Sequence, residues 1–440
     1  MDNNKKMPRR IAQAVINSLK GGVVPRVGLP YVTVGRKHEI EAMLRDIEIV
    51  GEGGASFRFI MGRYGSGKSF LMQTIRNYAM ERGFAVCDAD LSPERRLQGT
   101  RGQGLATYRE LMRNLATRTR PEGGALMLAI DKWISGVEAS VAADGAEAGS
   151  DIFRGEVERK IFDVIRSMDE LVHGFDFARV LTLYCRSYWS GDDETKGRVM
   201  KWLRGEYKTR SEARAELGVN VIITDDDWYE YLKLFAFFFC LAGYRGMLVL
   251  IDELVNIYRI PNTVTRNNNY EKILTMYNDA MQGKAHHIGI IMSGTPECVE
   301  DRRRGAYSYE ALRSRLTAGK FAGMGDGMRD MLAPVICLDP LTPEEMMVLA
   351  EKLRDIHAGL YGCDLRIDEN DLASFIKIEY ARVGASRKIT PREIIRDFIE
   401  LLDILYQHPE KSAEEILGSD EFKYADTQEG DAGEFADFTI

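Results

Sequence analysis

The sequence predicts an α/β fold built on a mostly parallel sheet that helices cover on both faces. Short apolar runs of strand type alternate with helical patterns along the chain, and this alternation is typical of parallel sheets. The run that begins at 246 is continuously apolar, as expected for a strand buried on both faces. Three of the runs end in polar residues, so one edge of the sheet should carry side chains suited to a ligand.

The elements can be placed in order along the chain. The first strand, 57–61, is followed by a glycine-rich segment and by a helical pattern that stops at Gly83, with one face formed by Leu71, Ile75, Tyr78 and Ala79. Further strands are predicted at 84–90, 246–256, 287–297 and 333–345. The last leads into a helix whose start is marked by a capping arrangement of Thr342, Pro343 and Glu345.

Composition limits the class of protein. The 440 residues suffice for two or three domains. A net charge of −8 argues against a broadly basic surface, so any DNA contact would need a local patch or the inner face of an oligomer. The six cysteines are scattered without zinc spacing, and we expect reduced, mostly buried thiols. No signal peptide or membrane-spanning run is apparent; the longest apolar stretch, 231–243, suits a buried helix, and a cytoplasmic protein is expected.

Four domains or segments are expected. They are an N-terminal segment at 1–45, a core at 46–340 that carries the sheet and is interrupted by a helical insertion at about 101–243, a C-terminal helical domain at 341–417, and an acidic disordered tail at 418–440. Within the insertion, the small-residue stretch 137–152 is predicted to be a loop.

The strongest motif is the glycine-rich segment. Gly62, Gly67, Lys68 and Ser69 satisfy the spacing G-x-x-x-x-G-K-[ST] between a predicted strand and helix. Backbone N–H groups in such a turn form an anion cradle at the positive end of the helix dipole, Lys68 reaches the outer phosphates, and the Ser69 hydroxyl is a ligand for Mg²⁺. The flanking strand and helix favour this interpretation over a surface turn. The predicted nucleotide-binding residues here are Gly62, Tyr64, Gly65, Ser66, Gly67, Lys68, Ser69 and Phe70.

Acidic and hydroxyl residues end two other strands. Asp252 is predicted to hold Mg²⁺ through water, and Glu253 to orient or deprotonate the attacking water. The alternative is a pair of acids that begins the next helix. Ser293 or Thr295 could bond the same water or the γ-phosphate, or could belong to an ordinary turn.

Basic residues at three places in the chain suggest functional roles. Arg392 lies in the first turn of a predicted helix, where a cation is unfavourable to the dipole unless an anion offsets it. Arg313 and Arg315 form a cluster that a solvated basic face would also explain. The basic run 195–214 interleaves Lys and Arg with Trp202 and Tyr207, which suits DNA contact with stacking, although a solvated helix face is the more frequent explanation.

Together these pieces resemble the AAA+ class of P-loop ATPases. Walker A corresponds to 62–69, Walker B to 247–253, a polar sensor strand end to 293–295, an arginine helix to 313–315, and a second-sensor helix start to 391–393. The segment 28–44 is similar to the box that precedes Walker A in the origin-recognition and signalling branches. That similarity implies that Gly35 and Arg36 lie near the adenine.

More narrowly, the segments 19–36 and 61–86 resemble the BREX-associated ATP-binding family, the BrxD-like proteins of bacterial phage defence, over essentially the whole chain. The resemblance implies ATP and Mg²⁺ as ligands, a homo-oligomer in which Arg315 acts on the neighbouring subunit's nucleotide, and Arg392 as the second sensor. Walker A and B are separated by about 180 residues, more than in a minimal AAA+ core. The role of the insertion is therefore not implied by the class.

Three functions remain open from the sequence. The first is an oligomeric ATPase that works with DNA-processing partner proteins in phage defence, with DNA bound directly or through those partners and without membrane association. The second is a nucleotide-gated signalling or scaffolding module with little turnover. The third is a loader ATPase for replication or transposition.

Overall fold

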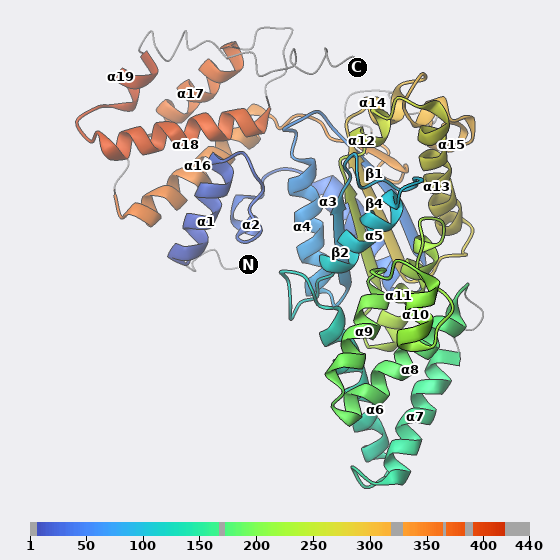
Figure 1. Ribbon diagram of the computed structural model, residues 1–440. Coiled ribbons are helices and arrows are strands. Elements are labelled where there is room, and N and C mark those ends of the chain that lie inside the picture. The colour runs from blue at the N-terminus through green and yellow to red at the C-terminus, as the bar shows by residue number, and fades with distance from the viewer. Residues whose placement is uncertain (1–6, 167–171, 318–328, 364–366, 383–389, 419–440) are drawn as a thin grey trace. The chain divides into compact units, whose positions relative to one another are not determined.

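The computed structural model describes residues 7–166, 172–317, 329–363, 367–382 and 390–418. They form two compact units (Figure 1). Unit 1 consists of the described residues of 1–35, 64–70 and 339–440, and unit 2 of those of 36–63 and 71–338. Of the predicted acidic tail, residues 419–440 lie outside the described residues.

Unit 2 contains a five-stranded parallel sheet in the order β2-β3-β4-β1-β5. The strands are β1 Ala55–Met61, β2 Ala85–Asp90, β3 Met247–Asp252, β4 Ile288–Gly294 and β5 Val335–Cys337. The prediction of an α/β fold with a parallel sheet is confirmed. The strands after β1 are shorter than predicted: β2 begins one residue later, and β3, β4 and β5 end earlier than predicted.

Helices cover both faces of the sheet, as predicted. Alternate residues of β1 point to opposite faces, since side chains of a strand alternate. Phe57 and Phe59 pack in the same apolar cluster as α5 Gln103–Arg113, α11 Trp228–Leu241 and α13 Thr263–Met281. Ile60 packs in a second cluster with α3 Lys37–Gly51 and α4 Lys68–Glu81.

Between β2 and β3, the described residues form seven helices. Besides α5 and α11 they are α6 Leu126–Ala143, α7 Asp151–Arg166, α8 Gly174–Ser190, α9 Asp193–Leu203 and α10 Arg210–Leu217. In Figure 1, α6, α7 and α8 extend beyond the amino end of the sheet. The predicted loop at 137–152 is wrong for 137–143, which continue α6, because alanine is a strong helix former. The predicted buried helix at 231–243 corresponds to α11, whose aromatic side chains are buried.

Short elements follow β3 and β4. They are α12 Val255–Tyr258 after β3, and α14 Glu297–Glu300, the 3₁₀ helix η1 Ala306–Ser308 and α15 Glu310–Leu316 after β4. Among the described residues, no helix is long and apolar enough to cross a bilayer. The six cysteines form no disulfide; Cys87, Cys185 and Cys298 are buried as predicted, whereas Cys337 is exposed.

Unit 1 is helical. It contains α1 Arg9–Lys20, α2 Leu29–Val32, α16 Pro343–Tyr361, α17 Glu369–Arg382, α18 Pro391–Gln407 and α19 Ala413–Gly418. Val15, Leu353, Phe375 and Phe398 lie in its core, and Phe70 packs against that core. The predicted capping box of Thr342 and Glu345 begins α16, with Pro343 at the first helical position.

Candidate functional site

The carboxyl ends of β3 and β4 bring three predicted site residues together. Asp252 is the last residue of β3, and its Oδ1 accepts hydrogen bonds from Ser293 Oγ and from the backbone N of Glu253, the latter at 2.7 Å. Leu254 N donates to Ser293 O at 3.0 Å, so the chain after β3 is held against the end of β4. Because adjacent parallel strands end at one edge, Asp252, Glu253 and Ser293 form a single polar group.

Glu253 has an unusual backbone conformation. Its φ is +64°, in the left-handed region that residues other than glycine rarely adopt. The turn is stabilised by Asn256, whose Nδ2 donates to Leu91 O at 2.8 Å and to Glu253 O at 3.3 Å. The N-cap of α12 is Leu254, whose side chain makes no capping hydrogen bond, and the two acids directly precede it. Their interpretation as ligand and base therefore stays a prediction, beside the alternative of a helix-starting pair.

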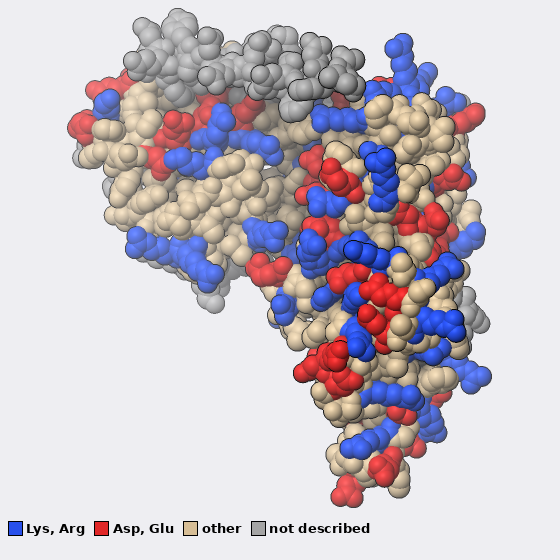
Figure 2. Space-filling view, viewed as in Figure 1, with Lys and Arg blue, Asp and Glu red and all other residues tan. Residues whose placement is uncertain are grey.

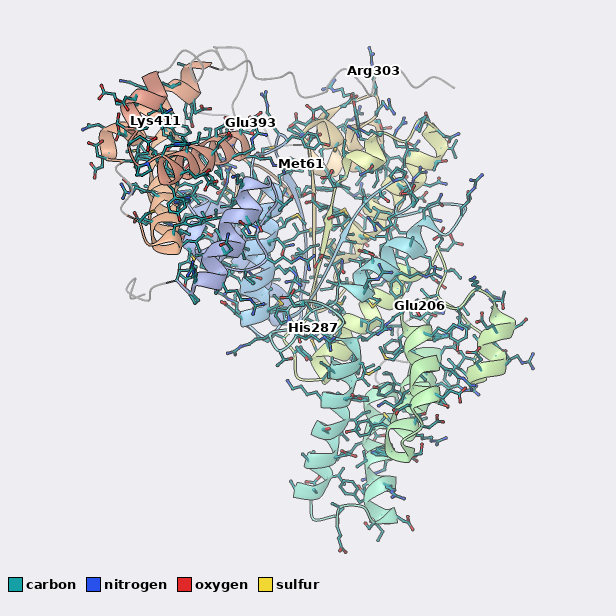
Figure 3. The ribbon with its side chains drawn as sticks, turned by 60° about the vertical axis from the view of Figure 1, so that its left-hand side comes forward. Met61, Glu206, His287, Arg303, Glu393 and Lys411 are labelled. Atoms are coloured by element: carbon teal, nitrogen blue, oxygen red, sulfur yellow. The ribbon has the colours of Figure 1, made fainter. Side chains whose placement is uncertain are left out.

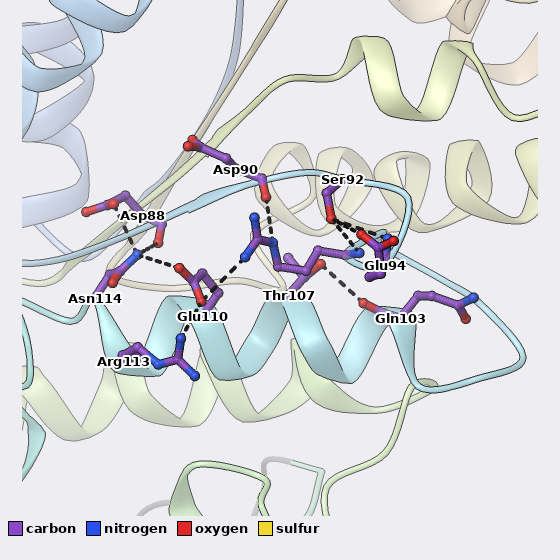
Figure 4. Close-up of polar contacts among 10 residues, drawn as sticks. Asp88, Asp90, Ser92, Glu94, Gln103, Thr107, Glu110, Arg113 and Asn114 are labelled. Carbon is purple, nitrogen blue, oxygen red and sulfur yellow. Dashed lines mark hydrogen bonds and ion pairs between the residues drawn. The ribbon is translucent and has the colours of Figure 1, made fainter. Parts of the chain in front are cut away.

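A further acid stands beside Asp252. Asp90 ends β2 directly opposite Asp252 in the sheet register. Partial desolvation raises the pKa of Asp90, and the negative charges of Asp252 and Asp88 raise it further. Figure 4 shows that Asp88 accepts from Asn114, while Arg95 Nε donates to the backbone O of Asp90 at 3.0 Å. Arginines offset these acids in part, since Arg76 Nε lies 3.1 Å from Asp88 Oδ1 and the charge of Arg95 lowers the pKa of Asp90.

The glycine-rich segment connects β1 to α4. Gly62 N donates to Gly294 O at 3.1 Å, which fixes the start of the segment at the carboxyl edge of β4. Gly65 and Gly67 have φ of +72° and +92°, conformations that favour glycine. Lys68, Ser69 and Phe70 form the first turn of α4.

Two other residues of this segment differ in exposure. Tyr64 is 52% exposed, and its ring lies 5.6 Å from Lys68 Nζ. Ser66 is buried. The segment therefore lies between a strand and a helix and contains a turn with glycines, which is the order of elements that the motif requires.

Within unit 1 the same segment lies against the start of α18. A Cβ placed on Gly65 would stand 2.7 Å from Thr390 Oγ1. Thr390 forms a capping box with Glu393 at the N-terminus of α18, and Arg392 lies in the first turn of that helix. Arg392 is exposed; its stem passes over Gly22, and its guanidinium makes no hydrogen bond or ion pair within the described part of the chain. Thr390 was not predicted as a site residue, although the pattern T-P-x-E marks a helix start.

Gly35 and Arg36 lie between α2 and α3, and both have positive φ. A Cβ on Gly35 would meet Glu345 Oε1 at 2.6 Å. Arg36 precedes α3, and its Nη1 lies 3.7 Å from Glu39 Oε1. Their predicted role near an adenine stays a prediction.

The arginines of α15 contact residues outside the polar group at the ends of β3 and β4. Arg315 Nε donates to Asn278 Oδ1 of α13 at 2.9 Å, and Nη1 donates to Ala311 O. Arg313 forms a 3.7 Å ion pair with Glu310 on its own helix. Thr295 follows β4, and its hydroxyl lies 3.5 Å from Cys298 Sγ.

The basic run 195–214 differs from its prediction. Trp202 and Tyr207 are 1% and 2% exposed, and they bond to Val221 O and Glu216 respectively. Lys201 bonds to Glu212 at 2.5 Å, and Arg198 to Glu194 at 2.7 Å. The expectation that these aromatics stack on bases is wrong, because tertiary packing buries them.

The donor groups suit a divalent cation bound with a phosphate ligand. In the described residues there is no group of three or more His, Cys, Asp or Glu side chains arranged around a metal. Mg²⁺ bound to nucleotides commonly uses one or two protein oxygen ligands together with phosphate oxygens and water. Asp252 in unit 2, which lies beside Asp90, is an oxygen donor of this kind, and so, taken by itself, is the Ser69 hydroxyl in unit 1.

Comparison with known proteins gave one family match. The model of the family described as BREX system ATP-binding protein BrxC/D matches residues 7–421. A search of curated proteins found no match.

Proposed function

The chain belongs to the family of BREX system ATP-binding proteins BrxC/D, and from this premise we propose that it is an AAA+-type ATP hydrolase that works with DNA-processing partners in phage defence. In this proposal the segment from Gly62 to Phe70 binds the phosphates of ATP. The positive φ of Gly65 and Gly67 and the helix that begins at Lys68 support it, since such a turn directs backbone N–H groups at an anion.

Ser69 and Asp252 are the proposed ligands of Mg²⁺, directly and through water respectively. When bound, the ion would neutralise phosphate charge as it develops during transfer. Ser293, which donates to Asp252, would keep that carboxylate oriented.

The backbone conformation of Glu253 is the observation that favours ATP hydrolysis over ATP binding alone. Its left-handed backbone is held by contacts of Asp252, Leu254 and Asn256. Strained conformations that the surroundings impose are concentrated at functional sites. We assign Glu253 the role of orienting and deprotonating the attacking water.

The remaining site assignments follow the AAA+ arrangement. Arg392 is proposed as the second sensor, supported by its exposed position in the first turn of α18, the helix whose N-cap residue Thr390 lies against Gly65. Arg315 is proposed to act on the nucleotide of a neighbouring copy in a homo-oligomer. Gly35 and Arg36 are proposed to lie near the adenine.

The same proposal divides the chain into functional parts. These are the N-terminal segment 1–45, a core at 46–340 with the helical insertion at about 101–243, a helical lid at 341–417 and a tail at 418–440. The run of helices from α5 to α11 between β2 and β3 supports the insertion, and the helices from α16 to α19 after β5 support the lid, whereas α3 Lys37–Gly51 crosses the boundary at 45.

Phosphate release and nucleotide binding by the full chain would test the function. We expect turnover that requires Mg²⁺, is abolished by chelation, and is stimulated by DNA. Tight binding of ATP without turnover would contradict hydrolysis and support a nucleotide-gated scaffold instead.

A further inference from the structure

The loop after α14 carries three consecutive arginines that the structure divides into two roles. Arg304 turns inward: its Nη2 donates to Arg259 O at 3.1 Å, and its guanidinium lies 5.4 Å from the ring centre of Tyr258. Tyr270 donates from its hydroxyl to Arg304 O at 2.5 Å. Arg302 and Arg303 are exposed instead. Within the described residues, neither of their guanidinium groups takes part in a hydrogen bond or an ion pair.

The loop is held in one conformation. Asp301 Oδ1 accepts from Arg303 N at 2.6 Å and from Arg304 N at 3.2 Å, and its Oδ2 accepts from Tyr258 OH at 2.9 Å. Gly305 closes the loop, and a Cβ there would stand 2.5 Å from Glu297 O. The loop geometry is therefore built independently of the Arg302 and Arg303 side chains.

The carboxylate of Asp301, the acid in the loop, accepts these hydrogen bonds. They lower the pKa of Asp301, with the largest effect from the backbone N of Arg303 and the next from Tyr258. The other nearby acids, Glu297 and Glu300, are exposed on α14. A third exposed arginine, Arg259, belongs to the segment that Arg304 and Asp301 bind, so it lies beside the loop.

The loop lies at the carboxyl end of the sheet (Figure 3), where a ligand could reach it. In Figure 3, Arg303 and Met61 lie at the carboxyl end of the sheet and His287 at its amino end, and the Arg303 side chain points away from the protein. Figure 2 shows basic side chains projecting from the same end of unit 2 around α14. Glu206, in the predicted basic run, lies nearer the end marked by His287, and basic and acidic side chains alternate around α9 and α10 (Figures 2 and 3).

We propose that Arg302 and Arg303, with Arg259 beside them, form a surface that binds the phosphate backbone of double-stranded DNA. Arginine recognises phosphate through paired N–H donors, and backbone contacts carry no sequence information. In the run 195–214, by contrast, Lys201 and Arg198 are paired with acids and both aromatic rings are buried. In the loop, Asp301 is bonded to Tyr258 and to the loop backbone, and Arg302 and Arg303 are exposed. The proposal does not depend on ATP hydrolysis, because binding can be measured without nucleotide.

Fluorescence anisotropy with a labelled 30-base-pair duplex of random sequence tests this surface. Replacing both arginines, Arg302→Glu with Arg303→Glu, should lower affinity at least about tenfold at moderate salt, equally for unrelated sequences. The slope of log K against log salt should become shallower by about 2, since each phosphate contact contributes about 0.9. The pair Arg302→Lys with Arg303→Lys keeps the charges and should retain most of the affinity.

The matched control is Arg210→Glu with Arg214→Glu, which makes the same charge change at two exposed arginines of α10. It should leave the affinity and the salt slope close to those of the unmodified chain. Equal loss in both double variants, loss in the control alone, or no duplex binding by the unmodified chain would overturn the proposal. Unchanged DNA binding with impaired self-association of the Arg302 and Arg303 variant would also overturn it, and would assign the loop to a second copy of the chain.

Discussion

Gly65 of the phosphate-loop motif lies directly against Thr390, the N-cap residue of α18. The Cβ that any other residue would add at position 65 would be 2.7 Å from Thr390 Oγ1, and the φ of +72° disfavours such a residue independently. The contact joins the motif to the helix that carries Arg392. A larger side chain at position 65 would therefore disturb both the motif and the helix that carries the proposed second sensor.

Gly65→Ala should destabilise the protein more than Gly67→Ala does. Both positions have positive φ, which costs an alanine about 1–2 kcal/mol, but an added Cβ at Gly67 has no neighbour within 4 Å. We therefore expect a larger fall in melting temperature for Gly65→Ala, measured without nucleotide. Adding Thr390→Gly, which removes the colliding atoms, should restore part of the loss, whereas strictly additive effects would contradict a direct collision.

Lys68→Ala and Glu253→Gln should separate binding from turnover. Loss of the lysine removes a charged donor to phosphate, so ATP affinity should fall about 10- to 100-fold. Glu253→Gln preserves shape and should leave affinity nearly unchanged while turnover falls about 10²- to 10⁴-fold, because a general base is lost. Equilibrium binding and single-turnover hydrolysis measure the two effects. An equal loss of affinity in both variants would contradict the role assigned to Glu253.

Arg315→Ala should lower turnover without weakening ATP binding, and should do so in the assembled protein. A residue that acts across a subunit interface stabilises charge that develops during transfer, an effect of about 10³- to 10⁵-fold in arginine-finger enzymes. Because Arg315 is bonded to Asn278, it would have to leave that partner to reach another copy. Arg313→Ala, on the same helix, is the matched control. Full activity of a strictly monomeric enzyme would exclude this role.

The sequence predicted those parts of the fold that local patterns determine. The run before Asp252 is apolar at every position and forms β3, and Asp252 and Glu253 mark the point where the strand ends. The motif from Gly62 to Ser69 specifies its own turn through glycine, lysine and a following helix. Strand, turn and helix therefore follow from neighbours along the chain.

Other features depend on residues far apart in the sequence. The contact of Gly65 with Thr390 and the bond of Arg315 to Asn278 have no local signal. The prediction that Trp202 and Tyr207 stack on bases is wrong for the same reason. Their basic neighbours suggest a solvent-facing surface, but packing buries both rings. The strand order likewise depends on pairing between distant segments, and β5 is too short, at three residues, for its own pattern to fix its limits.

The final prediction concerns pH and the helices of unit 1. Asp403 of α18 accepts from Lys20 Nζ of α1 at 2.6 Å and pairs with the buried His357 of α16 at 2.9 Å. Burial acts to raise the pKa of Asp403, but the hydrogen bonds from Lys20 and His357 outweigh it and hold that pKa below its ordinary 3.8. The hydrogen bond to Asp403 is the main cause that raises the pKa of Lys20 above 10.5.

These two shifts set the pH window in which the pair stabilises the fold. A carboxyl group with a lowered pKa contributes fully above its unfolded value of 3.8, and the contribution is lost as pH falls through the lower folded value. An amine with a raised pKa contributes below 10.5 and loses the contribution as pH rises through its folded value. Asp403→Asn should therefore lower the melting temperature by a constant amount between about pH 5 and 9, and the difference should shrink outside that range. Glu400→Gln, an exposed carboxylate on the same helix, should change the melting temperature little at any pH. The difference in melting temperature between Asp403→Asn and the unmodified chain could instead be independent of pH down to acid unfolding. That result would show that the carboxylate acts through packing and not through its charge.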